Sequence, residues 1–205
     1  MTSRTIATSV RCVDGPTPEG AALERALDDL RRRFPGAIIE RYLDRAPRLG
    51  ERVRIAAGAA IVGDVELADD VSVWYGAIVR GDVNRVEVRE RSNLQDGAVV
   101  HLGDEDGVLI AEEVVVGHRA VIHGARIGGG TLVGIQATIL DGAVIGEGSV
   151  IGACALVTAG TEIPPHSLVL GAPARVIKRL DAAAEAFHRE LALKYVRLQH
   201  NYRVG

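Results

Sequence analysis

The sequence predicts an all-β repeat protein: a parallel β-helix of hexapeptide repeats, with a C-terminal α-helix and a short helical N-terminal extension. Composition is the first reason, since 24 of 205 residues are glycine and only 3% are aromatic, so Val, Ile, Leu and Ala must form the core. Periodicity is the second, because an aliphatic residue occupies every sixth position over residues 127–169. These positions are Ile127, Val133, Ile139, Ile145, Ile151, Val157, Ile163 and Val169.

The six-residue step recurs upstream, with one slip and one insertion. Its positions there are Ile55, Ile61, Leu67, Val73 and Val79, then Val88, Leu94 and Val100, then Ile110, Val116 and Ile122. Each unit is one short strand and a corner, the aliphatic residue points inward, and glycine permits the corner. Three units make a coil, and about six coils cover residues 55–169 at roughly the 4.8 Å strand spacing. A β-sandwich fits poorly because its turns do not recur every six residues. The spacing leaves the handedness open, although the rule for crossovers favours a right-handed coil.

Three segments follow along the chain. Residues 1–40 form an extension, in which residues 19–34 carry Leu23, Leu27, Leu30 and Phe34 on one helical stripe. Residues 41–180 form the β-helix. Residues 181–205 form a helix that packs on it, since residues 181–203 contain no Gly or Pro.

Composition also excludes several classes of function. The net charge is −3 and there is no basic stripe, which argues against nucleic-acid binding. Apolar runs are only a few residues long, so we expect no membrane span. No apolar signal segment is visible at the N-terminus, and the two cysteines, Cys12 and Cys154, cannot form a disulfide framework. We therefore expect a cytoplasmic protein.

Two histidines occupy equivalent positions on adjacent coils. His101 follows Val100 and His123 follows Ile122, three units later. Their separation is one coil of 18 residues plus four extra residues, which we assign to a loop at Gly103–Asp106. The two Cα atoms should therefore lie about one strand spacing apart, so that the rings can share a metal ion.

A third histidine, His118, is third in its unit and belongs to the preceding face. A neighbouring subunit supplies such a ligand more easily than the same chain, which predicts a cyclic trimer with interfacial metals. Gln95 lies on the face of His118, one coil away. Arg80, Asp82 and Asp96 suggest a charge-paired network, with a trimer salt bridge and a catalytic role both open.

These residues resemble a known family. The resemblance lies in the segments Val79-Arg80-Gly81-Asp82 and Asn93-Leu94-Gln95-Asp96-Gly97, in His101, and in the segments Val116-Gly117-His118 and Ile122-His123-Gly124. Together they resemble the gamma-class carbonic anhydrases, in particular a bacterial branch with a short loop. The resemblance covers roughly residues 41–205. The tail Gly171-Ala172-Pro173-Ala174-Arg175 is shared with acyltransferases of the same fold.

The resemblance implies a left-handed β-helix and a homotrimer that binds zinc, with iron or cobalt as alternatives. It implies that His101 and His123 of one subunit and His118 of its neighbour hold the metal. A metal-bound hydroxide would convert carbon dioxide reversibly to bicarbonate. By the same likeness, Gln95 hydrogen-bonds the metal-bound water, Tyr195 lies near the site, and Arg80, Asp82 and Asp96 link subunits.

Two departures from the family pattern bear on activity. Val83 stands where the best-studied branch has a glutamate, and the loop after His101 is short. In that loop, Asp104 and Glu105 either carry protons or form a solvated turn. Two other functions stay open: a hexapeptide-repeat acyltransferase that uses one histidine as base with acyl-coenzyme A, and a metal-binding trimer with little hydratase activity that serves as a scaffold or thioester hydrolase.

Overall fold

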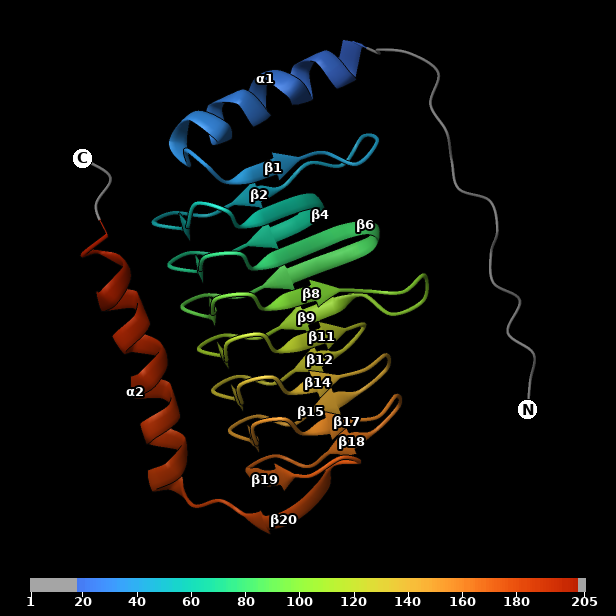
Figure 1. Ribbon diagram of the computed structural model, residues 1–205, viewed down its shortest axis with the longest axis vertical. Helices are drawn as coiled ribbons and strands as arrows, with labels where there is room; N and C mark the ends of the chain where they lie inside the picture. The colour runs from blue at the N-terminus through green and yellow to red at the C-terminus, as the bar shows by residue number, and fades with distance from the viewer. Residues whose placement is uncertain (1–17, 203–205) are drawn as a thin grey trace.

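The computed structural model describes residues 18–202 and confirms the predicted β-helix. The chain forms a left-handed parallel solenoid of about seven turns (Figure 1). Helix α1 (Pro18–Arg33) lies across one end, and helix α2 (Ala182–Gln199) runs along one side. Residues 1–17 of the expected extension and residues 203–205 of the expected C-terminal segment lie outside the described part of the chain.

The strands are short and stack in parallel from coil to coil. Strands of the sheet that wraps two faces are β1 (Ile38–Glu40), β2 (Arg48–Leu49), β4 (Ala60–Leu67), β6 (Ile78–Val88), β8 (Val99–His101), β9 (Val108–Ile110), β11 (Val121–His123), β12 (Arg126–Ile127), β14 (Thr138–Ile139), β15 (Val144–Ile145), β17 (Leu156–Val157) and β18 (Glu162–Ile163). The remaining sheet contains β3 (Arg54–Ile55), β5 (Ser72–Val73), β7 (Asn93–Leu94), β10 (Val115–Val116), β13 (Leu132–Val133), β16 (Val150–Ile151), β19 (Ser167–Leu170) and β20 (Arg175–Arg179), the last of which pairs antiparallel with β19.

The interior is the aliphatic register that the sequence predicts. Residues at the six-residue step are buried, and several are completely inaccessible, including Val100, Val116, Ile122 and Ile139. Aligned aliphatic residues pair across coils, as Ile122 does with Val100 and with Ile139. Burial of this continuous stack stabilises the solenoid by removing apolar surface from water.

Glycine takes the left-handed backbone at several corners, as the sequence predicts, for example at Gly130, Gly142 and Gly148, whereas the glycines directly after the aliphatic positions do not. Several corner residues with left-handed backbone are not glycine, among them Glu113 and Gln136, whose φ angles are 58° and 58°. Gly134 instead permits close approach of coils, because a Cβ there would lie 2.6 Å from the backbone nitrogen of Ala153. A side chain at Gly134 would therefore force two coils apart.

The solenoid begins before the first position of the regular repeat. Ile38–Glu40 pairs in parallel with Ala60–Val62, so the sheet reaches into the segment 1–40 that the sequence assigns to an extension. Helix α1 contacts β1, and Leu27 of this helix and Phe34, which directly follows it, are buried in the core. The apolar stripe of this helix thus covers the open end of the first coil, which would otherwise expose apolar side chains.

We expect Leu27→Ala to lower the free energy of unfolding by about 2–5 kcal/mol, because Leu27 is only 1% exposed and its loss leaves a cavity. Leu23→Ala on the same helix is the control, since Leu23 is half-buried and should cost about 1 kcal/mol or less. Denaturant unfolding at one fixed protein concentration measures both. Equal, small effects would show that α1 does not cap the core.

Helix α2 is anchored along its length. The Asp181 side chain accepts a hydrogen bond from the backbone of Ala184 and caps its first turn. Ala192 and His188 are buried against the solenoid, and Arg189 pairs with Glu113 at 2.6 Å. Phe187, in the first half of this helix, is 66% exposed. Within residues 18–202, neither helix is long and apolar enough to cross a membrane.

Candidate metal centre

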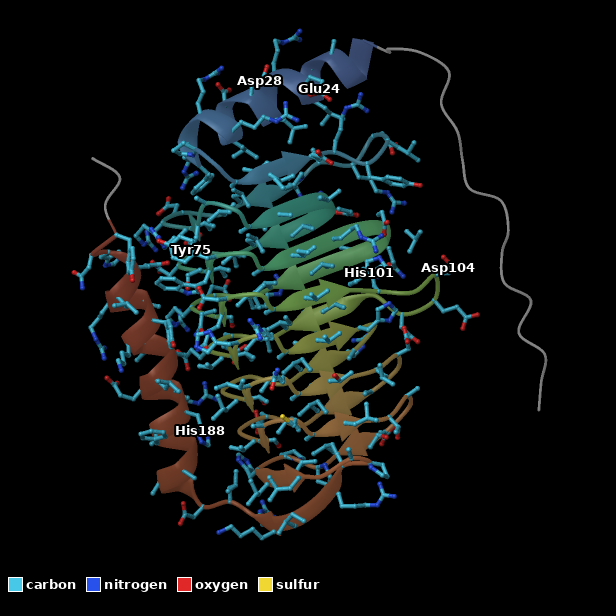
Figure 2. The ribbon with its side chains drawn as sticks, in the orientation of Figure 1. Glu24, Asp28, Tyr75, His101, Asp104 and His188 are labelled. Atoms are coloured by element: carbon cyan, nitrogen blue, oxygen red, sulfur yellow. The ribbon has the colours of Figure 1, made fainter. Side chains whose placement is uncertain are left out.

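His101 and His123 lie side by side, as their register predicts. His101 ends β8, His123 ends β11, and the two residues are paired across the parallel strands. Nδ1 of His101 is 3.1 Å from Nε2 of His123, and the ring centroids are 5.1 Å apart. Figure 2 shows His101 on the side of the solenoid away from α2.

Each of these rings meets a carboxylate at its outer nitrogen. Nε2 of His101 is 3.1 Å from Oδ1 of Asp82, and Nδ1 of His123 is 2.7 Å from Oδ1 of Asp141. A carboxylate accepts hydrogen bonds, so both outer nitrogens carry the proton and donate. When both rings are neutral, their facing nitrogens therefore both present lone pairs.

Two lone pairs 3.1 Å apart repel each other unless a cation lies between them. A shared proton is disfavoured because burial lowers the pKa of His101, an effect that outweighs its hydrogen bond to Asp82. Two imidazole ligands of tetrahedral zinc, at about 2.0–2.1 Å each, are separated by roughly 3.3 Å. The donor pair therefore fits a divalent metal ion, and its outer carboxylates are the usual partners of metal-binding histidines.

His118 lies on another face and has its own carboxylate. It follows β10, in the sheet that does not contain β8 and β11. Its Nδ1 is 2.8 Å from Oδ2 of Asp96, which leaves Nε2 as the remaining ligand atom. Within one chain, residues 18–202 contain no group of three or more His, Cys, Asp or Glu side chains that could hold a metal ion. A single chain thus carries His101 and His123 apart from His118.

Gln95 and Tyr195 accompany His118. Asp96, the partner of His118, directly follows Gln95, which is almost fully buried and donates to Oδ1 of Asn93 at 3.3 Å. Burial and, secondarily, the Asp96 charge raise the pKa of Tyr195, which also hydrogen-bonds to Gln95. Tyr195 therefore keeps its proton near neutral pH, and its hydroxyl oxygen can accept a hydrogen bond from the Gln95 amide, a contact that lowers the pKa of Tyr195.

The expected Arg80, Asp82 and Asp96 network is divided within one chain. Arg80 pairs with Asp82, whereas Asp96 lies with His118. Burial raises the pKa of Asp82, but hydrogen bonds from the Val83 backbone, His101 and Arg80 outweigh it and hold that pKa below its usual value. Asp82 consequently stays ionised and keeps both Arg80 and His101 in place.

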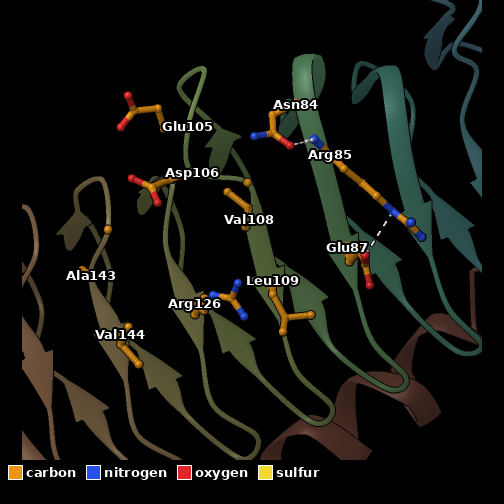
Figure 3. A pocket seen from close by; sticks show the side chains of 13 residues that line it. Asn84, Arg85, Glu87, Glu105, Asp106, Val108, Leu109, Arg126, Ala143 and Val144 are labelled. Carbon is orange, nitrogen blue, oxygen red and sulfur yellow. Dashed lines mark hydrogen bonds and ion pairs between the residues drawn. The ribbon is translucent and has the colours of Figure 1, made fainter. Parts of the chain in front are cut away.

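The short loop after His101 projects from the solenoid, and Figure 2 shows Asp104 at its tip. Asp104 and Glu105 are exposed. Below them is an open groove of about 490 Å³, whose polar lining includes Arg85, Asp106 and Arg126 (Figure 3). This placement gives both acids access to solvent.

The candidate site residues therefore fall into two groups within one chain. We call His101, His123, Asp82 and Asp141 the two-histidine cluster. We call His118, Asp96, Gln95 and Tyr195 the one-histidine cluster. The sequence interpretation missed Asp141, although the residue stands 18 residues after His123, the length of one regular coil. Stepping by 18 residues from each candidate ligand would have found it.

Comparison with known proteins identifies the repeat and the family of the chain. Residues 124–159 match the model of the bacterial transferase hexapeptide family (six repeats). The chain is 53% identical over 150 residues to a protein of Methanocaldococcus jannaschii named "Probable carbonic anhydrase", covering 73% of this chain and 94% of that protein. It is 36% identical over 161 residues to mitochondrial gamma carbonic anhydrase 1 of Arabidopsis thaliana, covering 76% of this chain and 58% of that protein.

A solved structure of a hexapeptide transferase family protein from Anaplasma phagocytophilum has a TM-score of 0.77 and 32% identity, covering 81% of this chain and 98% of that one. Transferases thus share the solenoid. The long match to the archaeal relative and the match to the plant enzyme assign the chain to the carbonic anhydrases rather than to the transferases. The chain belongs to the gamma-class carbonic anhydrase family and is, by that membership, a carbonic anhydrase-like lyase.

Proposed function

We propose that this chain catalyses the reversible hydration of carbon dioxide to bicarbonate at metal centres between the subunits of a homotrimer. One observation carries the proposal: the facing nitrogens of His101 and His123, each ring held at its outer nitrogen by a carboxylate. Such a pair is suited to a metal ion and to little else. Family membership supplies the reaction.

The separation of the two clusters supports the trimer. A metal held by three histidines needs His118 beside His101 and His123, yet His118 belongs to another face of its own chain. Around a threefold axis, the one-histidine cluster of each subunit can meet the two-histidine cluster of the next. Every subunit then contributes to two metal sites.

The metal, when bound, supplies a Lewis acid that lowers the pKa of a water ligand from 15.7 to about 7. The chain's own residues would orient the reacting oxygen and carry the proton away. Gln95 orients the reacting oxygen, since its amide can both donate and accept, and Tyr195 holds that amide in place. Asp82 restrains Arg80 beside the two histidines. Asp104 and Glu105, on the exposed loop, can pass the released proton to solvent.

Three imidazoles accept several divalent ions, so the donor set favours zinc and admits iron or cobalt. A similar solved structure from Bacillus cereus, 35% identical, is named a putative acetyltransferase, which favours acyl transfer from acyl-coenzyme A as a second function. That chemistry needs one histidine as general base, and it leaves the His101/His123 pair without a role. A metal-binding trimer with little hydratase activity, acting as a scaffold or thioester hydrolase, is the third candidate because the loop is short.

Stopped-flow measurement of carbon dioxide hydration tests the proposal. We expect a trimer by light scattering, about one metal per subunit, and a fall in kcat/KM of about a thousandfold in His123→Ala. Glu147→Gln, a change in an exposed acid away from both clusters, is the control and should leave the rate unchanged. A monomer that holds full metal, or hydration equal in His123→Ala and the unmodified protein, would refute the proposed site.

A further inference from the structure

We infer that Asp141 is a positioning residue, which fixes the tautomer and orientation of His123 so that Nε2 is free to bind metal. The inference rests on the proposed metal centre, but it concerns contacts present in a single chain. Asp141 lies in the turn between β14 and β15, one coil beyond His123. Its Oδ1 is 2.7 Å from Nδ1 of His123.

The backbone fixes this contact. Strand β14 pairs in parallel with β11, and the backbone nitrogen of Gly142 donates to the carbonyl of Gly124 at 2.7 Å. The turn that carries Asp141 is therefore locked to the turn that follows His123. The carboxylate does not depend on a flexible loop for its position.

Two glycines leave room for the carboxylate. A Cβ at Gly124 would lie 2.5 Å from Oδ1 of Asp141, and a Cβ at Gly103 would lie 3.2 Å from the same atom. Any residue other than glycine at position 124 would therefore force the Asp141 carboxylate to move. The loop after β8 and the turn after β11 thus both provide space at the point where the carboxylate reaches the His123 ring.

The proton position on His123 follows from this contact. A carboxylate accepts the Nδ1 proton, which leaves the lone pair on Nε2, facing Nδ1 of His101 at 3.1 Å. An amide in place of the carboxylate can donate to Nδ1 and thereby move the proton to Nε2. A proton on Nε2 occupies the position where the metal binds.

We therefore expect Asp141→Asn to change the His123 tautomer. Two-bond ¹H–¹⁵N spectra of the metal-free trimer, labelled at histidine, should show Nδ1 protonated in the unmodified protein and Nε2 protonated in the variant. The metal-loaded variant should lose zinc to a chelator about 10–100 times faster than the unmodified protein. Asp141→Ala supplies no new donor and should give a mixture of tautomers with intermediate zinc loss.

Asp106→Asn is the matched control, since Asp106 is a half-buried acid in the neighbouring loop and lines the groove below it. This variant removes the same charge and should change neither the His123 tautomer nor the rate of zinc loss. Unchanged tautomer and unchanged zinc loss in both Asp141 variants would overturn the inference, even with hydration intact. Conversely, a tautomer change in a protein that hydrates no carbon dioxide would support the role of Asp141 and refute only the proposed function.

Discussion

Mixing His118→Ala chains with His123→Ala chains should restore metal binding and hydration, although each variant alone has neither. Equal amounts of the two chains, unfolded and refolded together, should regain about a quarter of the sites of the unmodified trimer, the statistical value for a cyclic trimer with one site per interface. Metal content after gel filtration and stopped-flow hydration rates measure the recovery.

The expected recovery follows from the division of ligands within one chain. The His118→Ala chain keeps the His101 and His123 pair, which are on adjacent strands. The His123→Ala chain keeps His118 and its Asp96 partner on the other face. Every mixed trimer then has one interface at which an intact pair meets an intact His118.

A second mixture distinguishes an interfacial site from a general effect of refolding. His101→Ala and His123→Ala chains are each damaged in the same cluster, so no interface between them contains all three histidines. This mixture should recover nothing. Recovery in both mixtures, or in neither, would contradict the assignment of His118 to the neighbouring subunit.

The six-residue repeat by itself determines much of this architecture. A residue at a known step of a parallel coil faces inward or outward by necessity, because the stack of aliphatic side chains sets the phase of every unit. The pairing of His101 with His123 follows from that phase alone and is confirmed. The four extra residues between them do not disturb it, since they leave the solenoid as a loop.

Other features depend on side-chain reach and irregular segments, which periodicity does not encode. The contact of Asp82 with His101 is the first such feature, because the position of Asp82 in the repeat suggested only a network with Arg80 and Asp96. The first coil is another, since the stretch between β1 and β2 does not follow the six-residue step. Helix α1 shows an apolar stripe in the sequence, but the surface that this stripe covers becomes known only from the fold.

Removing the metal should abolish hydration and leave the β-helix folded. The three histidines lie at the outer surface, whereas Val100 and Ile122 beside them are fully buried in the aliphatic stack. The stack does not involve the imidazole rings, so its burial energy is unchanged when the rings lose their ligand. Without the metal, the lone pairs of His101 and His123 face each other at 3.1 Å, so the two rings should move apart.

The measurement is a chelation series that follows bound metal, hydration rate and far-UV circular dichroism on the same samples. Hydration should fall in proportion to bound metal, with a residual rate about a thousandfold below that of the loaded protein. The dichroism should stay constant. Zinc, cobalt or anaerobic iron added back should restore the rate, whereas His118→Ala should not respond to any of them.

Thermal unfolding completes the test. A metal that binds the folded trimer and not the unfolded chain stabilises it by about 2.7 kcal/mol at a free concentration of 100 times the dissociation constant. The stripped protein should therefore unfold at a lower temperature, in one transition, and regain stability with metal. Hydration that survives complete chelation would remove the metal from the mechanism. Acyl transfer that survives it would instead favour the acyltransferase, because a single histidine base needs no metal.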